Sequence, residues 1–337
     1  MMASNLASTD GKAYFYFITL MRALAAIVIT NAHYTGIYPS DYIANGGLLG
    51  DVMFFSVSGF CLANPKLSFV KWYPKRLWRI YAVVWVITLV FVLLGVYHIG
   101  SFKDGVIAFL HPTYYHFVAS ITLLYIPLYI ITKHIELTRR NYALLAIGLF
   151  VAQLLLYVFL YDKSYYHIDT VREPMIEFIF FQSMLLGLFF RREFVTNSLS
   201  EKNSHRRGQN IVLWIALVVV MGVYFASKLL FVKRVSLSEF QIANQVVLFI
   251  ALILLFCCLR SLEERLKRLS VKKIWKVVVF LSDHTLEIYC VQYVLIEAVR
   301  NWGLPFPINW IVLTSLIIVS AAALRWVSQR LISLVKI

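Results

Sequence analysis

The sequence predicts an all-α integral membrane protein, a single bundle of about ten transmembrane helices with both termini in the cytoplasm. Of 337 residues, 61% are hydrophobic and only 15% are charged, whereas a soluble domain has close to half apolar and about a quarter charged residues. The apolar residues form runs of about 20 residues, the length that crosses a bilayer. Short polar segments separate the runs, so we expect one membrane domain over residues 1–337 and no separate soluble domain.

The expected helices follow one another along the whole chain. They cover residues 15–36, 48–64, 80–98, 114–132, 142–161, 174–190, 210–231, 240–259, 275–297 and 308–327. An even number of spans returns the chain to the side on which it began. The first dozen residues are polar and the first run lacks a small-residue cleavage site, so we expect an uncleaved first span and no signal peptide.

Basic residues fix the predicted orientation. The net charge is +15, and about 24 of the 32 basic residues fall in segments on the same side as the N-terminus. Loops rich in Lys and Arg stay in the cytoplasm. This distribution accounts for the basic balance without a nucleic acid partner.

The four cysteines predict neither a disulfide nor a metal site. Cys61, Cys257, Cys258 and Cys290 all lie in apolar runs, without a CxxC pair and without histidines at metal-ligand spacing. We therefore interpret them as small buried hydrophobic residues.

The first apolar run contains two ionisable residues, Arg22 and His33. Eleven residues make about three helical turns, so both side chains project from nearly the same face, roughly 16 Å apart along the axis. A charged side chain at membrane depth usually faces a protein interior or a wet cavity. On this helix alone, Arg22 could instead snorkel to the headgroups and His33 could lie at the interface.

Three further segments carry polar chemistry. Small residues in the second span, among them Ser56 and Gly59, favour close helix packing. A cluster of Lys75, Arg76 and Arg79 opens the third helix and could grip phosphates, or could simply be a positive-inside cluster.

The ninth span contains Asp283 and Glu287 one turn apart, which is costly unless they face a cavity or a cation. Arg22 is one candidate partner for these two carboxylates. Both are therefore candidate intramembrane acidic partners of the site.

Together these segments resemble the acyltransferase type 3 family of integral-membrane O-acyltransferases, over most of the chain. Such proteins have an Arg, ten residues and then a His in the first helix, a Gly-x-x-x-Phe-Phe-x-x-Ser-Gly-Phe signature in the second, basic residues opening the third, and a late Ser/Thr-x-x-Ile-Tyr segment. The matching residues here are Arg22 and His33; Gly50, Phe54, Phe55, Ser58, Gly59 and Phe60; Lys75, Arg76 and Arg79; and Thr285, Ile288 and Tyr289.

The chain departs from the family pattern at two positions. The family often has an acidic residue two positions before the Phe pair, where this chain has Val52, and the acid is the preceding Asp51. A helix turns by about 100° per residue, so Asp51 points in another direction. The late segment often continues to a His, where this chain has Gln292.

The resemblance implies transfer of an acetyl group from cytoplasmic acetyl-CoA to a hydroxyl of a sugar or polysaccharide beyond, or lipid-linked at, a bacterial cytoplasmic membrane. Capsule, exopolysaccharide and O-antigen sugars are the expected acceptors, and no metal is required. His33 would be the catalytic base or would carry the acetyl group itself, Arg22 would serve the donor channel, and Lys75, Arg76 and Arg79 would bind the phosphates of CoA. A transporter or flippase of a lipid-linked sugar is the alternative, against which stands the lack of internal repeats and of matched Gly- or Pro-interrupted helices.

Overall fold

The computed structural model describes residues 14–110, 115–170, 173–198 and 207–335, and every regular element in them is a helix. The first half contains α1 (Tyr16–Ala32), α2 (Gly47–Cys61), α3 (Phe69–Leu93), α4 (Phe102–Phe109), α5 (His116–His134), α6 (Arg139–Phe159) and α7 (Pro174–Ser198). The second half contains α8 (Arg207–Lys233), the 3-10 helix η2 (Val235–Phe240), α9 (Ile242–Arg260), α10 (Glu263–Leu269), α11 (Lys273–Asp283), α12 (Thr285–Asn301) and α13 (Ile308–Leu334).

Seven of the described helices are long and apolar enough to cross a membrane: α3, α5, α6, α7, α8, α9 and α13. The two first helices, α1 and α2, are apolar but shorter, with 17 and 15 residues. Helix α6 exposes most of its large apolar side chains, such as Ile147 and Phe159, which suits a lipid-facing surface. The chain is therefore a multi-pass helical membrane protein, as predicted.

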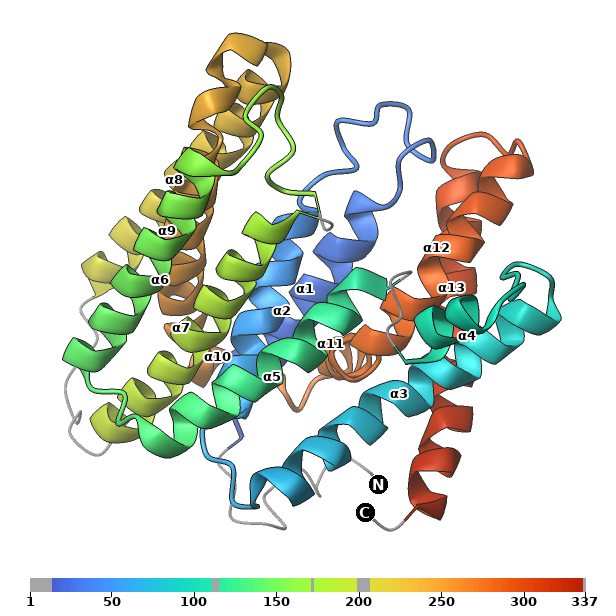
Figure 1. Ribbon diagram of the computed structural model, residues 1–337, viewed down its shortest axis with the longest axis horizontal. Helices are drawn as coiled ribbons and strands as arrows, with labels where there is room; N and C mark the ends of the chain where they lie inside the picture. Colours follow the sequence, from blue (N-terminus) through green and yellow to red (C-terminus); the bar gives the residue numbers. More distant parts are fainter. Residues whose placement is uncertain (1–13, 111–114, 171–172, 199–206, 336–337) are drawn as a thin grey trace.

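The helices form two groups around α1 and α2. Helices α6, α8 and α9 lie to one side and α12 and α13 to the other, while α3 and α5 cross in front (Figure 1). We call the end of the bundle at which α1 begins and α2, α7 and α13 end the basic face. The loop 33–46, which joins α1 to α2, lies at the opposite end.

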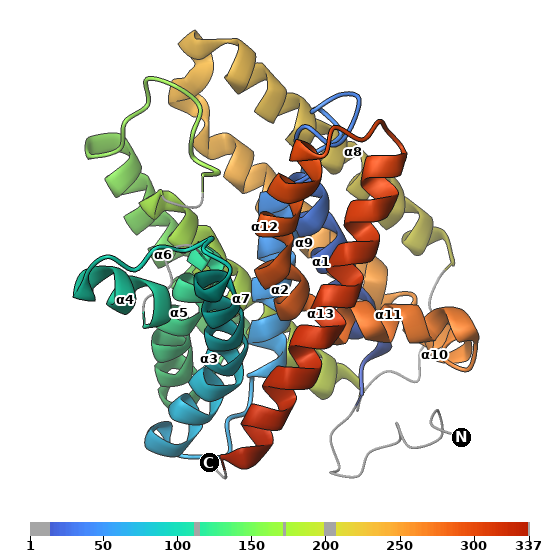
Figure 2. The ribbon, with the colours of Figure 1, turned by 90° about the vertical axis from the view of Figure 1, so that its right-hand side faces the viewer.

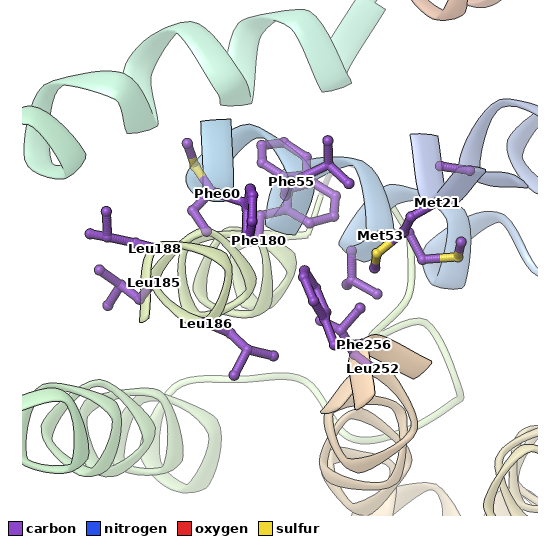
Figure 3. Packing of buried hydrophobic residues seen from close by; sticks show 14 of the residues in the cluster. Met21, Met53, Phe55, Phe60, Phe180, Leu185, Leu186, Leu188, Leu252 and Phe256 are labelled. Atoms are coloured by element: carbon purple, nitrogen blue, oxygen red, sulfur yellow. The ribbon is translucent and has the colours of Figure 1, made fainter. Parts of the chain in front are cut away.

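Helices α2 and α7 share the most extensive helix–helix contact in the described part of the chain, and Figure 3 shows Phe55 and Phe180 at this contact. Phe55 of α2 stacks on Phe180 of α7 with ring centroids 4.1 Å apart. A methyl group on Gly59 would lie 2.7 Å from the carbonyl carbon of Met184, and one on Gly187 would lie 2.7 Å from that of Ser56. The two backbones therefore touch, which confirms the predicted close packing of the second helix.

The predicted ninth span is wrong as a single helix. Helix α11 ends at Asp283 and α12 begins at Thr285, and α11 lies across the lower part of the bundle while α12 runs upward beside α1 (Figure 2). Side chains at the break bond to local carbonyls: Thr285 Oγ1 donates to Ser282 at 2.9 Å and His284 Nδ1 to Phe280 at 2.7 Å. Such bonds compete with helix continuation.

Candidate functional site

Helix α1 is held at its first turn by a carboxylate from another helix. No side chain of its own caps it. Instead, the N–H groups of Tyr16 and Phe17 donate to the two carboxylate oxygens of Glu263 in α10, at 2.9 and 2.8 Å. A negative charge at a helix N-terminus satisfies unpaired donors and complements the helix dipole.

Helix α2 packs closely on the middle of α1. A methyl group on Gly50 would lie 2.6 Å from the Ile29 side chain and 3.1 Å from the carbonyl oxygen of Ala25. A larger residue at position 50 would push the helices apart. Glu263 thus fixes the position of α1 along its own axis, and Gly50 sets how closely α1 lies to α2.

Arg22 opens into a polar cavity of about 220 Å³ toward the basic face. Its Nη2 lies 3.5 Å from the Sγ of Cys61, at the end of α2. The cavity is lined by Arg22, Phe54, Ser58, Cys61, Leu62, Arg76, Tyr125, Ser282, Asp283, Thr285 and Leu286. Residues from α1, α2, α3, α5, α11 and α12 converge here, so we call it the arginine cavity.

The predicted cluster at the start of α3 is divided by the helix. Only Arg76 lines the arginine cavity; Arg79 is exposed and Lys75 is half-buried outside the lining. Neighbouring helical residues point about 100° apart, so Lys75 and Arg76 cannot face one cavity equally. The structure brings together Arg22 and Arg76, which lie far apart in the sequence.

The two acidic residues have different surroundings. Asp283 is exposed in the wall of the arginine cavity, on the same side as Arg22. Glu287 is buried, and its Oε1 lies 3.5 Å from Nη1 of Arg325 in α13. Arg325 also donates a hydrogen bond to the carbonyl oxygen of Asp283. Arg22 is one candidate partner of these two carboxylates from the sequence, but the cation that contacts Glu287 in the structure is Arg325 of the last helix.

His33 lies just beyond the last residue of α1 and caps the helix. Its Nδ1 is 2.7 Å from the carbonyl oxygen of Ile29. Because a carbonyl can only accept, Nδ1 carries the proton and Nε2 keeps a free lone pair. This is the state in which an imidazole can take a proton or attack an acyl group.

Gln292 of α12 faces His33. Its side-chain nitrogen lies 3.4 Å from Nδ1, and its Oε1 is buried without a hydrogen-bond partner among the described residues. Half a turn of the amide would place Oε1 at this distance, where it would share the Nδ1 proton with the carbonyl oxygen of Ile29. Gln292 and the cavity-lining Thr285 are seven residues apart on α12, about two turns, so one face of α12 contacts the regions of both Arg22 and His33, as the spacing on α1 predicts.

Asp51 has no such contact. It is buried in α2, and within the described part of the chain nothing forms a hydrogen bond or ion pair with its carboxyl group. Val52, at the position where the family pattern often has the acid, is fully buried. The structure thus gives no contact between Asp51 and Arg22 or His33.

A second, mostly apolar cavity of about 150 Å³ lies between α1, α12 and α13. Tyr34, Tyr38 and Trp310 line it, together with Thr30, whose buried hydroxyl has no partner among the described residues. Tyr34 follows His33 directly in the sequence. The end of α1 therefore borders an aromatic-lined space as well as Gln292.

Sequence reasoning missed several of these residues. Cys61 was expected to be buried, but it is exposed in the arginine cavity. Its position one residue after Phe60, at the end of the second-span signature, was the only available signal. Tyr125 and Gln292 are polar residues in apolar helices, a pattern that points to interior contacts without naming the partner.

These features define a class: a multi-pass helical membrane protein in which an intramembrane arginine cavity and a histidine with a free Nε2 lie along one helix. The family model described as an acyltransferase domain, type 3, matches residues 15–328. The chain therefore belongs to the acyltransferase type 3 family, and the membership supports an acyltransferase activity. No curated protein and no solved structure gives a significant match to the chain.

Proposed function

We propose that the protein is an O-acetyltransferase that moves an acetyl group from cytoplasmic acetyl-CoA to a hydroxyl of an extracytoplasmic or lipid-linked sugar, such as a unit of a capsule, exopolysaccharide or O-antigen. The observation that carries this proposal is the placement of Arg22 and His33 along one side of α1, the first in a polar cavity and the second with a free Nε2. The excess of basic residues at the basic face supports a cytoplasmic orientation of that face in a bacterial cytoplasmic membrane.

The arginine cavity is the proposed donor site. Arg22 and Arg76 supply guanidinium groups that suit phosphate or thioester oxygens. The N-terminal turn of α12 also borders the cavity through Thr285, and helix N-termini favour negative charge. Lys75 and Arg79 lie on the same segment of α3, where they would attract the anionic donor from the cytoplasm.

His33 is the proposed base. Its Nε2 would take the proton of the sugar hydroxyl as the hydroxyl oxygen attacks the thioester carbonyl. The bond from the carbonyl carbon to sulfur then breaks, and the thiolate of CoA leaves with the proton that His33 had accepted. The same lone pair could instead attack the thioester first, expelling the thiolate of CoA and forming an acetyl-histidine. The sugar hydroxyl then attacks the acetyl carbon, the bond from that carbon to Nε2 breaks, and the hydroxyl proton passes to the released Nε2 and from there to the thiolate. The tautomer with Nδ1 protonated suits both routes.

The aromatic cavity beside His33 is the proposed place for the acceptor. Tyr34, Tyr38 and Trp310 offer flat faces, and Thr30 offers a hydroxyl that has no partner among the described residues. Aromatic faces with a few polar groups are typical of small-molecule sites. No step of the reaction requires a metal.

A transporter or flippase of a lipid-linked sugar is the second candidate, and the break between α11 and α12 favours it. Interrupted helices that point an N-terminus at a polar cavity are typical of transporters. The break occurs at His284, without Gly or Pro. Family membership supports acyl transfer over transport, and consumption of acetyl-CoA separates the two.

The test compares His33→Ala with the matched control His98→Ala, because His98 is exposed in the segment after α3 and is not among the lining residues of the cavities described above. Purified protein is assayed for thiol release from acetyl-CoA in the presence of surface polysaccharide, and polysaccharide from cells is examined for O-acetyl signals by NMR. We expect loss of both signals in the deletion strain and in His33→Ala, and retention in His98→Ala. Thiol release by His33→Ala at the normal rate would remove His33 from the mechanism, and no release by the unaltered protein would favour transport.

A further inference from the structure

A third cavity, polar like the arginine cavity but separate from it, opens at the basic face. It has a volume of about 440 Å³ and lies where α2 and α5 end and α7 passes. Its lining consists of Ala63, Asn64, Thr132, Ile135, Glu136, Leu137, Leu188, Arg191 and Arg192. We call it the α7 cavity. Two of its residues are arginines and one is an acid, so its charge balance is positive.

Arg191 carries a charge that none of the described carboxylates neutralises. Its guanidinium carbon lies 4.4 Å from the ring centre of Phe15 and 5.2 Å from that of Phe60. Among the described residues, no carboxylate forms an ion pair with it. These cation–π contacts hold the guanidinium near the two rings without using its N–H groups as hydrogen-bond donors.

Only one of the two terminal guanidinium nitrogens of Arg192 has a partner among the described residues. Its Nη2 lies 2.8 Å from Oε1 of Glu136, whereas its Nη1 is buried with no hydrogen-bond partner in the described part of the chain. Arg192 lines the α7 cavity, so its guanidinium brings to the cavity donor capacity that Glu136 does not use.

We propose that the α7 cavity binds a phosphate group. Two guanidinium groups and the side-chain amide of Asn64 together offer more donors than one carboxylate can accept, whereas a phosphate has three oxygens to share among them. The group comes either from a nucleotide-type soluble ligand or from the headgroup of an anionic phospholipid.

The position of the cavity suits both sources. Cys61 and Leu62 line the arginine cavity, and the next two residues, Ala63 and Asn64, line the α7 cavity. The two sites therefore adjoin at the end of α2, within reach of one extended ligand. Occupancy of the α7 cavity does not depend on acyl transfer, so this proposal and the proposed function can fail separately.

The experiment measures binding without turnover. The purified full chain, in detergent free of phospholipid, is titrated with adenosine 3′,5′-bisphosphate, with inorganic phosphate as competitor. The variants are Arg191→Met and Arg192→Met, since methionine keeps an unbranched side chain that can still pack on Phe15 and Phe60. Arg140→Met is the matched control, because Arg140 is exposed on the same face and lines no described cavity.

We expect each of the two cavity variants to bind the bisphosphate roughly tenfold more weakly or worse, as the loss of a charge-assisted hydrogen bond predicts, and Arg140→Met to bind normally. The titration is repeated in nanodiscs of phosphatidylcholine and of phosphatidylglycerol. Competition by phosphatidylglycerol that disappears in Arg191→Met identifies the lipid headgroup as the occupant, and binding that is independent of the lipid identifies the soluble source. Equal behaviour of all three variants, or no response to either probe, would overturn the proposal.

Discussion

The contact between α2 and α7 gives the sharpest test of the fold. Gly59 of α2 faces the backbone of Met184, and Gly187 of α7 faces that of Ser56. Replacing Gly59 by alanine would place a methyl carbon 2.7 Å from the carbonyl carbon of Met184 and 2.9 Å from its Cα. Both distances are below any that real methyl contacts show, and neither neighbour is a flexible side chain.

The loss of stability in Gly59→Ala follows from the helix separation that would relieve this clash. The helices would have to part by roughly 1 Å at the contact, and a gap of 0.5–1 Å forfeits a quarter to a half of the attraction of each atom pair across it. The affected interface includes the stacked Phe55 and Phe180, at the most extensive helix–helix contact in the described part of the chain. Overpacking of a tight core costs typically about 1–3 kcal/mol and occasionally more. We expect about 3 kcal/mol for Gly59→Ala, because the obstacle is backbone.

The control is Gly148→Ala in α6, where a methyl group would meet nothing within 4 Å. Alanine suits a helix better than glycine by about 1 kcal/mol in water, so this variant should be neutral or slightly stabilised. Unfolding free energies are measured for both variants by titration from mild detergent into dodecyl sulfate. A loss below about 1 kcal/mol in Gly59→Ala, or an equal loss in Gly148→Ala, would refute the inferred backbone contact.

Three further predictions concern the site. Gln292→Leu should leave folding intact but lower the turnover rate of any His33-dependent reaction severalfold and alter the pH profile of that rate. Gln292→His should restore part of the rate. Turnover rates measured across a range of pH would check both expectations. Arg325→Met should lower the free energy of unfolding by about 3 kcal/mol, because it leaves the buried Glu287 unpaired. The double variant with Glu287→Gln should recover most of this loss in the same detergent titration. Additive losses from the two substitutions would contradict the pairing. Glu263→Ala should lower the free energy of unfolding by about 1 kcal/mol, the usual loss when a helix loses its N-cap, and should speed hydrogen exchange in the first turn of α1. Equal exchange rates in the variant and the unaltered protein would show that this cap is dispensable.

Most helices could be predicted from hydropathy because a lipid-facing helix must be apolar over its full length. The expected run 142–161 corresponds to α6, with ends that differ by two or three residues, and the run 308–327 begins where α13 begins but stops before its end at Leu334. The largest boundary difference is in α3, which begins at Phe69, well before the expected residue 80. Its first turns carry the basic cluster, so an apolar count stops short of a helix that continues into polar surroundings.

The site could be predicted in part. The spacing of Arg22 and His33 gave their shared orientation, since helical geometry depends only on local sequence. The partners could not be predicted, because Gln292 lies 259 residues from His33 and Arg325 lies on a different helix from Glu287. Nothing in either segment says which face meets α1 or Glu287. Such contacts are decided by tertiary packing, which a single sequence does not encode in any local pattern.

The break at His284 is not visible in hydropathy, although the residues at the break are polar. The residues on both sides are apolar, so a 20-residue window registers one span, yet Ser282, Asp283, His284 and Thr285 form a polar run whose side chains can bond to their own backbone. Irregular backbone at membrane depth is tolerated where it lines a polar cavity, and this break borders the arginine cavity. The same interruption separates two carboxylates that an unbroken helix would hold on one face: Asp283 opens into the cavity, and Glu287 turns toward α13. A costly pair of acids in one helix thus becomes one acid exposed at the arginine cavity and one buried acid with a cation of its own.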